Sequence, residues 1–404
     1  MEILLIGNGF DLSCGLPTTY RDFLYFCDAI TILCYDDPSW LKLNMFHINT
    51  SDAFEKLLKK HWLPPHQIKK KLFEVYDALD PKTAPRRKTP YTAVVRKAYH
   101  YLNDNHWYRY FKNRLAYIGN NWIDFEKEIS HVIQMLDEAY HAFHKYPGYN
   151  DFPEEFRNKL RRISGDFSSG HTIFSSVDIF ETREKILDFS HTLSQHLDAL
   201  IHVLEIYLSA FIGDIDVQPA DISPDIAPIH PDWVLSFNYT DTFYRVCGKN
   251  RNIDYCYIHG KAESANNIES CNMVLGIDEY LENDRKNVDL EFLPFKKYYQ
   301  RIYKSTDNTY LDWVKHIRNH NEFSHTLYIF GHSLDVTDKD VLHQLICNDN
   351  VQTKIFYYRK HEHDKSVLGQ LIHNLVRIIG QDELIRRTGG SHRTIEFIPQ
   401  TLHK

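Results

Sequence analysis

The N-terminal segment constrains the fold most strongly. An apolar run at residues 2–6 leads into Gly7-Asn8-Gly9-Phe10-Asp11, and a helical pattern begins after Pro17-Thr18-Thr19. A strand, a glycine-containing turn and a helix in this order open many α/β nucleotide-binding units. Glycines in such a turn let backbone N–H groups approach an anion at a helix N-terminus. An ordinary tight turn would use the same two glycines, so this pattern alone leaves both interpretations open.

Strand and helix patterns alternate again from residue 232 onward. Candidate strands lie at residues 232–237, 254–259, 273–277, 325–330, 353–358 and 394–398, and candidate helices lie at 338–347 and 365–379. Short β-rich runs separated by helices are typical of a parallel sheet with helices on both faces. The sequence therefore predicts an α/β fold in which strand 2–6 is internal to the sheet that contains strand 232–237.

The segment between these two regions has a different hydrophobic period. Apolar residues lie at helical spacing from Ile129 to Tyr140, and again from Leu193 to Phe211. We therefore predict a nucleotide-binding domain made of residues 1–34 and 225–404, interrupted by a large all-helical insertion at residues 35–224.

Charge, hydropathy and cysteine content narrow the class of protein. Lys and Arg number 47 against 54 Asp and Glu, which argues against a generic basic surface for nucleic acid. No run approaches about 18 uninterrupted apolar residues, so no membrane contact is expected. The seven cysteines lack Cys-x-x-Cys and zinc-ribbon spacing. Together with the absence of a signal-peptide pattern, they favour a reducing, cytoplasmic location.

Polar or glycine-containing turns follow four of the candidate strands. Besides the turn at residues 7–11, they are Ser236-Phe237-Asn238-Tyr239-Thr240-Asp241, His259-Gly260 and Gly331-His332-Ser333-Leu334-Asp335. The carboxyl ends of parallel strands face the ligand crevice of an open α/β sheet, so these turns are candidate ligand-binding segments. Taken singly, each has a simpler explanation, such as a helix cap or a structural histidine.

The order and spacing of these turns resemble the sirtuin superfamily. That family begins with Gly-Ala-Gly-x-Ser, three residues and Gly-Ile-Pro, where this chain has residues 7–11, three residues and Gly15-Leu16-Pro17. Its Thr-Gln-Asn-Ile-Asp, His-Gly and Gly-Thr-Ser-Leu motifs are similar to residues 236–240, 259–260 and 331–334. A closer resemblance, which covers most of the chain, is to the bacteriophage abortive infection AbiH family. It is carried by residues 6–11, 237–241 and 331–335 and by Trp122-Ile123-Asp124-Phe125-Glu126.

The resemblance implies a sirtuin-like Rossmann core that binds NAD as its substrate. Asn238 would hold the ribose and the attacking water, and His259 would act as general base. An oxocarbenium-like transition state needs nearby negative charge, for which Asp124 and Glu126 are further catalytic candidates. The residues expected to contact the nucleotide are Gly7, Asn8, Gly9, Phe10, Asp11, Pro17, Asp241, Gly331, His332 and Ser333.

Two departures from the sirtuin pattern bear on the reaction. The family's final Asp in Thr-Gln-Asn-Ile-Asp is Thr240 here, with Asp241 one place later. No cysteine pairs follow His259, so the zinc module that helps to form the acyl-lysine site is missing, and protein deacylation is disfavoured. The reaction that such a site could still perform is transfer of the ADP-ribosyl carbon of NAD to water.

The expected function is therefore phage defence by hydrolysis of NAD to nicotinamide and ADP-ribose. A constitutive NAD hydrolase would kill its host, so we expect restraint by homo-oligomerisation or by the helical insertion, and release by a phage-derived trigger. One alternative is a nucleotide-binding sensor without turnover. Another is a metal-dependent nuclease; the run His361-Glu362-His363-Asp364 could ligate a metal but more simply forms an exposed loop, so no metal is expected.

Overall fold

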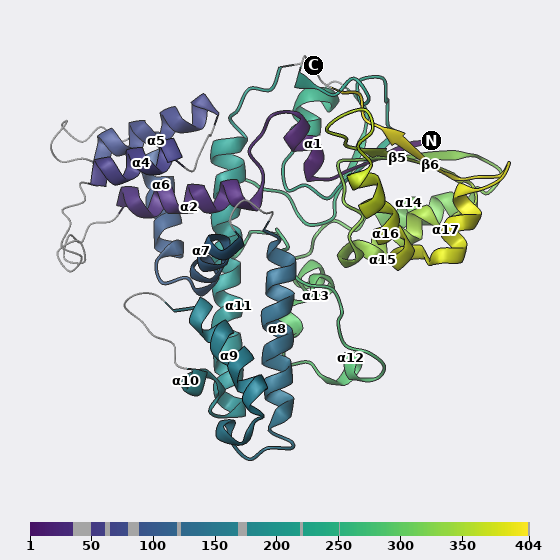
Figure 1. The fold of residues 1–404 in the computed structure, drawn as a ribbon. Coiled ribbons are helices and arrows are strands. Elements are labelled where there is room, and N and C mark those ends of the chain that lie inside the picture. Colours follow the sequence, from purple (N-terminus) through teal and green to yellow (C-terminus); the bar gives the residue numbers. More distant parts are fainter. Residues whose placement is uncertain are drawn as a thin grey trace. The chain divides into compact units, whose positions relative to one another are not determined.

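The computed structural model describes residues 1–34, 50–60, 65–79, 89–118, 123–168, 176–218, 221–249 and 251–402. The chain divides into two compact units (Figure 1). The sheet unit comprises residues 1–18, 216–262 and 301–404, and the helical unit comprises residues 19–215 and 263–300. Residues 19–34 and 263–300 thus group with the helices, whereas the boundaries drawn from the sequence placed both segments with the sheet.

A single parallel sheet of six strands, in the order β3-β2-β1-β4-β5-β6, organises the sheet unit. The predicted α/β fold is confirmed, and β1 lies between β2 and β4, so strand 2–6 is internal as predicted. This order is that of the doubly wound Rossmann fold. The strands are β1 (Glu2–Ile6), β2 (Trp233–Ser236), β3 (Asp254–Tyr257), β4 (His325–Phe330), β5 (Val351–Tyr357) and β6 (Ile395–Pro399).

The central strands are continuous apolar runs because both faces of the sheet are covered. In β1, Ile3, Leu4 and Leu5 have no exposed surface. Trp233 of β2 stacks on Trp313 with ring centroids 5.1 Å apart. The helical elements of this unit are α1 (Asn8–Ser13), the π-helical η4 (Tyr244–Gly248), α14 (Tyr310–Asn319), the 3-10 turn η6 (Val336–Asp338), α15 (Lys339–Ile346), α16 (Ser366–Ile379) and α17 (Gln381–Thr388). The predicted helices 338–347 and 365–379 are confirmed as α15 and α16.

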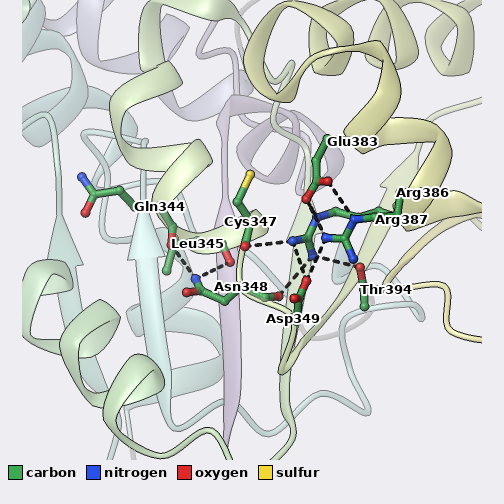
Figure 2. A network of polar contacts seen from close by, with 9 residues as sticks. All are labelled: Gln344, Leu345, Cys347, Asn348, Asp349, Glu383, Arg386, Arg387 and Thr394. Atoms are coloured by element: carbon green, nitrogen blue, oxygen red, sulfur yellow. Dashed lines mark hydrogen bonds and ion pairs between the residues drawn. The ribbon is translucent and has the colours of Figure 1, made fainter.

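A buried arginine ties α17 to the turn before β5 and to the start of β6 (Figure 2). Arg387 is only 1% exposed. All five N–H groups of a guanidinium find acceptors here, so burial leaves none of them unpaired. The acceptors are Glu383 Oε1 at 2.6 Å, the Asn348 carbonyl at 3.2 Å, Thr394 Oγ1 at 3.1 Å, the Cys347 carbonyl at 2.8 Å and Asp349 Oδ1 at 2.9 Å.

The helical unit has an aromatic core. Phe111 and Phe125 stack with ring centroids 3.8 Å apart, and the fully buried Trp107 packs on Phe111 at 5.6 Å. Its elements are α2 (Tyr20–Cys34), α4 (Thr50–Lys60), α5 (His66–Leu79), α6 (Pro90–Leu102), α7 (His106–Ile118), α8 (Phe125–Ala142), η1 (Tyr149–Asp151), α9 (Glu154–Asp166), α10 (Ser176–Phe180), α11 (Arg183–Ile206), the π-helical η2 (Tyr207–Ile212), α12 (Arg285–Val288) and η5 (Leu293–Phe295). The remaining helix, α13 (Lys297–Tyr303), contains a boundary between the units. The predicted stripe 193–211 runs along α11 into η2.

One predicted strand is wrong. Residues 273–277 lie in the helical unit and contribute only an isolated bridge between Ile277 and Lys296. The side-chain amide of Gln300 replaces a neighbouring strand there, because it accepts from the Leu275 N–H and donates to the Leu275 carbonyl, both at 3.1 Å. The run is apolar because it is buried, and its backbone is paired by a side chain.

The helices and the cysteines bear on the expected class of protein. None of the described helices is long and apolar enough to cross a membrane. All seven cysteines lie in the described part of the chain; none of them forms a disulfide, and five are buried. The burial of Cys14, Cys27, Cys34 and Cys256 fits small apolar side chains, as the odd count and the spacing predict.

Candidate functional site

The carboxyl ends of β1, β2, β3 and β4 carry the four turns singled out in the sequence. The strand order reverses between β1 and β4, because β2 and β3 lie on one side of β1 and β5 and β6 lie beyond β4. In open α/β sheets, ligands bind outside the carboxyl ends of the strands at such a switch point. The turns at residues 7–11 and 331–335 flank this position directly.

The turns after β1 and β4 approach so closely that their glycines are required. The Gly9 N–H donates to the Gly331 carbonyl at 2.8 Å, and the Gly7 N–H donates to the Phe330 carbonyl at 3.1 Å. A Cβ on Gly9 would lie 2.6 Å from the Gly331 Cα. The Gly9 amide is therefore used within the protein, and these glycines serve the contact between turns whether or not the turn also cradles a phosphate.

Replacing Gly331 with alanine is expected to destabilise the sheet unit by roughly 2–3 kcal/mol. Gly331 has φ +69°, and its Cβ would meet the Phe10 nitrogen at 2.4 Å. The matched control is Gly390→Ala, since Gly390 has φ +73° but no atom within 4 Å of its Cβ. Urea unfolding of both variants isolates the close approach, and equal losses of stability would show that the contact between turns contributes nothing.

Asn238 is buried, and its side-chain amide has no hydrogen-bond partner among the described residues. It lies in the turn after β2, directly after Phe237, and it is 5% exposed. Its backbone is fixed, because its N–H donates to Ser236 Oγ at 3.2 Å and its carbonyl accepts from that hydroxyl at 3.1 Å. Within the described chain, neither Oδ1 nor Nδ2 forms a hydrogen bond. A buried amide left in this way costs about 1–3 kcal/mol, so a partner such as water or a ligand is expected at these two atoms.

Asp11 brings a buried carboxyl to the same edge of the sheet. It lies on α1, is 1% exposed, and accepts from Thr240 Oγ1 at 2.6 Å. Burial raises the pKa of Asp11 to about 6, although the hydrogen bond from Thr240 partly offsets this effect. Thr240, which stands where the sirtuin motif has its Asp, thus holds a carboxylate supplied by a different turn.

This raised pKa predicts the pH dependence of stability. The folded state binds the Asp11 proton more tightly than the unfolded state does. The stability that this proton contributes is therefore fully present below about pH 3.8, and it is lost as pH rises through about 6. Asp11→Asn keeps an oxygen acceptor for Thr240 and removes the charge. We expect the variant to exceed wild type in stability at pH 7 by on the order of 1–3 kcal/mol, and by little at pH 4. Urea unfolding at both pH values measures this; a difference that does not change with pH would contradict the assignment.

His259, Asp338 and His332 form a connected group after β3 and β4. Asp338 Oδ1 lies 3.0 Å from His259 Nε2, and its Oδ2 lies 3.5 Å from His332 Nε2. The Leu334 N–H donates to His332 Nδ1 at 3.0 Å, which keeps the proton of the neutral ring on Nε2, facing the carboxylate. The Phe237 ring packs on both imidazoles, with centroids 5.4 Å from His259 and 4.3 Å from His332.

Asp338 was missed in the sequence. It lies at the end of η6 directly before α15, where an Asp is typical of a helix cap, so its type and position give no signal of a site. The Asp that the motif includes, Asp335, instead accepts from the Thr337 N–H at 3.2 Å and caps η6.

The other predicted nucleotide contacts have varied environments. Asn8 pairs with Thr18, whose hydroxyl donates to Asn8 Oδ1 at 2.6 Å. Phe10 has no exposed surface and packs on Phe243 and Phe330 in the core. Asp241 forms ion pairs with Arg245 at 3.0 Å and with Lys261 at 3.7 Å. Ser333 is exposed, and its carbonyl accepts from Asn374 at 2.8 Å. Pro17 lies in the segment between α1 and α2.

Asp124 and Glu126 lie in the helical unit and have local partners there. Asp124 caps α8, accepting from the Lys127 N–H at 3.2 Å and pairing with its Nζ at 3.0 Å. Glu126 forms an ion pair at 2.9 Å with the buried Lys297. Trp122 of the same motif lies outside the described residues. The helix cap and the ion pair thus explain both carboxylates without a role in the candidate site.

The run His361–Asp364 is an exposed loop, as the simpler interpretation predicts. Asp364 accepts from the Lys360 N–H and the Ser366 N–H, both at 3.0 Å, and these bonds hold its pKa below the ordinary value. Its oxygens serve the start of α16, so this run does not support the metal-dependent nuclease.

Comparison with known proteins identifies the family. The sequence model of the family described as bacteriophage abortive infection AbiH matches residues 3–358, which span β1 to the end of β5. No curated protein and no solved structure gives a significant match. The match includes every turn at the carboxyl edge of the sheet described above, and it supports a role in abortive infection by bacteriophage. The chain belongs to the AbiH family.

Proposed function

We propose that this AbiH protein binds NAD at the carboxyl edge of its sheet and hydrolyses it to nicotinamide and ADP-ribose. The observation that carries the proposal is the buried Asn238 amide, which has two donors and an acceptor to offer a ligand and none engaged by the described protein. It stands one residue from the Phe237 ring that packs on His259. The resemblance to sirtuins adds the identity of the ligand.

The chemistry requires little of the protein. The bond between the ribose C1′ and the nicotinamide nitrogen breaks, and nicotinamide leaves as a neutral molecule with the bonding electron pair. Water adds to C1′ and loses one proton. With His259 Nε2 hydrogen-bonded to Asp338, proton transfer by this imidazole would run through Nδ1. Asn238 would orient the water or the ribose hydroxyls.

Asp11 gives the proposed site its electrostatic character. A buried carboxylate is costly by itself, and a cationic nicotinamide-ribosyl group beside it would favour the ionised form. Positive charge on the reacting ribose is greatest in the transition state, so ionised Asp11 would stabilise that state relative to free NAD. The roles of Asp124 and Glu126 as further catalytic carboxylates are left out of this mechanism because both have partners in the helical unit.

Defence by NAD depletion needs restraint before infection. We propose that association of copies of the chain, or the helical unit, holds turnover low until a phage-derived trigger arrives. This restraint explains how a cell could carry the protein without losing its NAD.

The direct test incubates the purified chain with NAD, NADP or ATP, alone and with extract from phage-infected cells. Chromatography of the products then identifies the substrate. Release of nicotinamide and ADP-ribose in equal amounts supports the proposal. Binding of the nucleotide without release in either condition would favour the nucleotide sensor, and cleavage of added nucleic acid without nicotinamide release would favour the nuclease.

A further inference from the structure

Three side chains with different metal-ligating atoms converge in the helical unit. His202 and Glu205 lie one turn apart on α11, and Cys271 comes from the segment 263–300. One ligating atom of each lies within 4.8 Å of the other two. All three are buried, with exposures of 1%, 1% and 5%. The tightest approach is 2.9 Å, between His202 Nδ1 and Glu205 Oε2.

Among the described residues, no lysine or arginine pairs with the buried carboxylate of Glu205. Within the described chain its direct partners besides the cluster are the Glu263 N–H at 3.3 Å and Asn266 Nδ2 at 2.6 Å. The donors around Glu205, which are the His202 imidazole, the Asn266 amide and the Glu263 N–H, are those that an ionised carboxylate accepts from. The nearby Lys97 ammonium donates to the Asn266 carbonyl at 3.4 Å instead. A buried carboxylate of this kind needs a compensating charge.

A second cluster in the same unit shows the contrast. Asp137, His141 and Asp289 also place ligating atoms within 4.8 Å of one another. There Arg285 already supplies the cation, at 3.2 Å from Asp137 and 2.7 Å from Asp289. That cluster is a satisfied ion-pair network, whereas no lysine or arginine in the described ranges pairs with the His202 cluster.

We propose that His202, Glu205 and Cys271 bind a Zn²⁺ ion that fastens the segment 263–300 to α11. Imidazole nitrogen, carboxylate oxygen and thiolate sulfur are the donors that zinc takes in proteins, and His and Glu at i, i+3 on one helix face can ligate one ion. Water would complete a tetrahedral shell. Binding displaces the thiol proton of Cys271 to solvent, because the thiolate is the form that ligates zinc. This site concerns the helical unit alone and is independent of the NAD reaction.

This ion is not predictable from the sequence, since its ligands do not form a closely spaced Cys or His motif. The competing arrangement is a protonated His202 that neutralises Glu205 without a metal. Metal content distinguishes the two.

The test measures zinc in the full chain, produced with zinc in the medium and purified without a metal-affinity step. Mass spectrometry of the metal should find about one zinc per chain in wild type and under about a tenth of that in His202→Ala and Cys271→Ser. The matched controls are His191→Ala, an exposed position on the same helix, and Cys347→Ser in the sheet unit. Both should keep the wild-type zinc content.

A second measurement uses wild type only and so does not depend on the variants folding. Cobalt exchanged into the chain should give the strong visible bands of tetrahedral Co²⁺ and a sulfur-to-cobalt charge-transfer band, both lost when zinc is added. Wild type that retains neither zinc nor cobalt after desalting would overturn the proposal. Variants that keep the wild-type zinc content would overturn it as well.

Discussion

Replacing His259 with alanine is expected to lower nicotinamide release by about 10²–10⁴-fold while NAD affinity changes little. The imidazole is held by Asp338 at 3.0 Å and by packing against Phe237, so its loss removes a positioned base. Binding should persist, because most of the cofactor's contacts would lie at the turns after β1 and β4. The measurements are nicotinamide release and NAD binding, with circular dichroism as the check on folding.

Asn238→Ala should reduce the same rate, since it removes the amide that would orient the water or the ribose. Both residues would serve one chemical step, so the double variant should fall well short of the product of the single effects. The matched controls are His361→Ala in the exposed loop after β5 and Asn321→Ala, also exposed. Wild-type turnover in both single site variants would remove the hydrolase assignment and leave the nucleotide sensor.

Arg387→Met is expected to destabilise the sheet unit by about 3–4 kcal/mol. Methionine fills much of the same volume but removes the guanidinium donor to the Cys347 carbonyl and the Thr394 hydroxyl. The other three acceptors lose one of two donors, because both carboxylates also bind Arg386 and the Asn348 carbonyl also accepts from the Val351 N–H. Because the guanidinium joins α17 to the edges of β5 and β6, its loss loosens three elements at once. Urea unfolding at pH 7 measures the change.

The neighbouring Arg386 is a close control for this effect. It binds the same carboxylates, Glu383 at 2.7 Å and Asp349 at 2.8 Å, but its side chain is 53% exposed. Exposed ion pairs contribute about 0–1 kcal/mol, so Arg386→Met should cost far less. Equal losses for the two variants would show that burial of the Arg387 guanidinium does not make it structurally important.

The sheet could be predicted from the sequence because its strands are short apolar runs that end in glycine or polar turns. β1 and β4 match the predicted ranges 2–6 and 325–330. The error at residues 273–277 has a physical cause, since periodicity reports burial and cannot show that a glutamine side chain pairs the backbone.

The site was predictable only in part. Asn238, His259 and the glycines stand directly after strands, where the parallel sheet gathers them at one edge. Asp338 reaches the site through contacts with His259 and His332, which lie on other segments, and its sequence neighbourhood looks like an ordinary helix start. The sequence predicts a catalytic role for Asp124 and Glu126 from their charge. In the structure, Asp124 caps a helix N-terminus and Glu126 pairs with a buried lysine.

The most direct measurement follows NAD in cells during phage infection. Cells that carry wild type or Asn238→Ala at matched protein levels are sampled before and after infection, and NAD, nicotinamide and ADP-ribose are separated by chromatography. NAD hydrolysis at this site predicts that NAD falls and both products rise after infection with wild type only, and that Asn238→Ala loses protection together with this change. Protection by wild type with NAD unchanged would contradict NAD hydrolysis as the function of this protein.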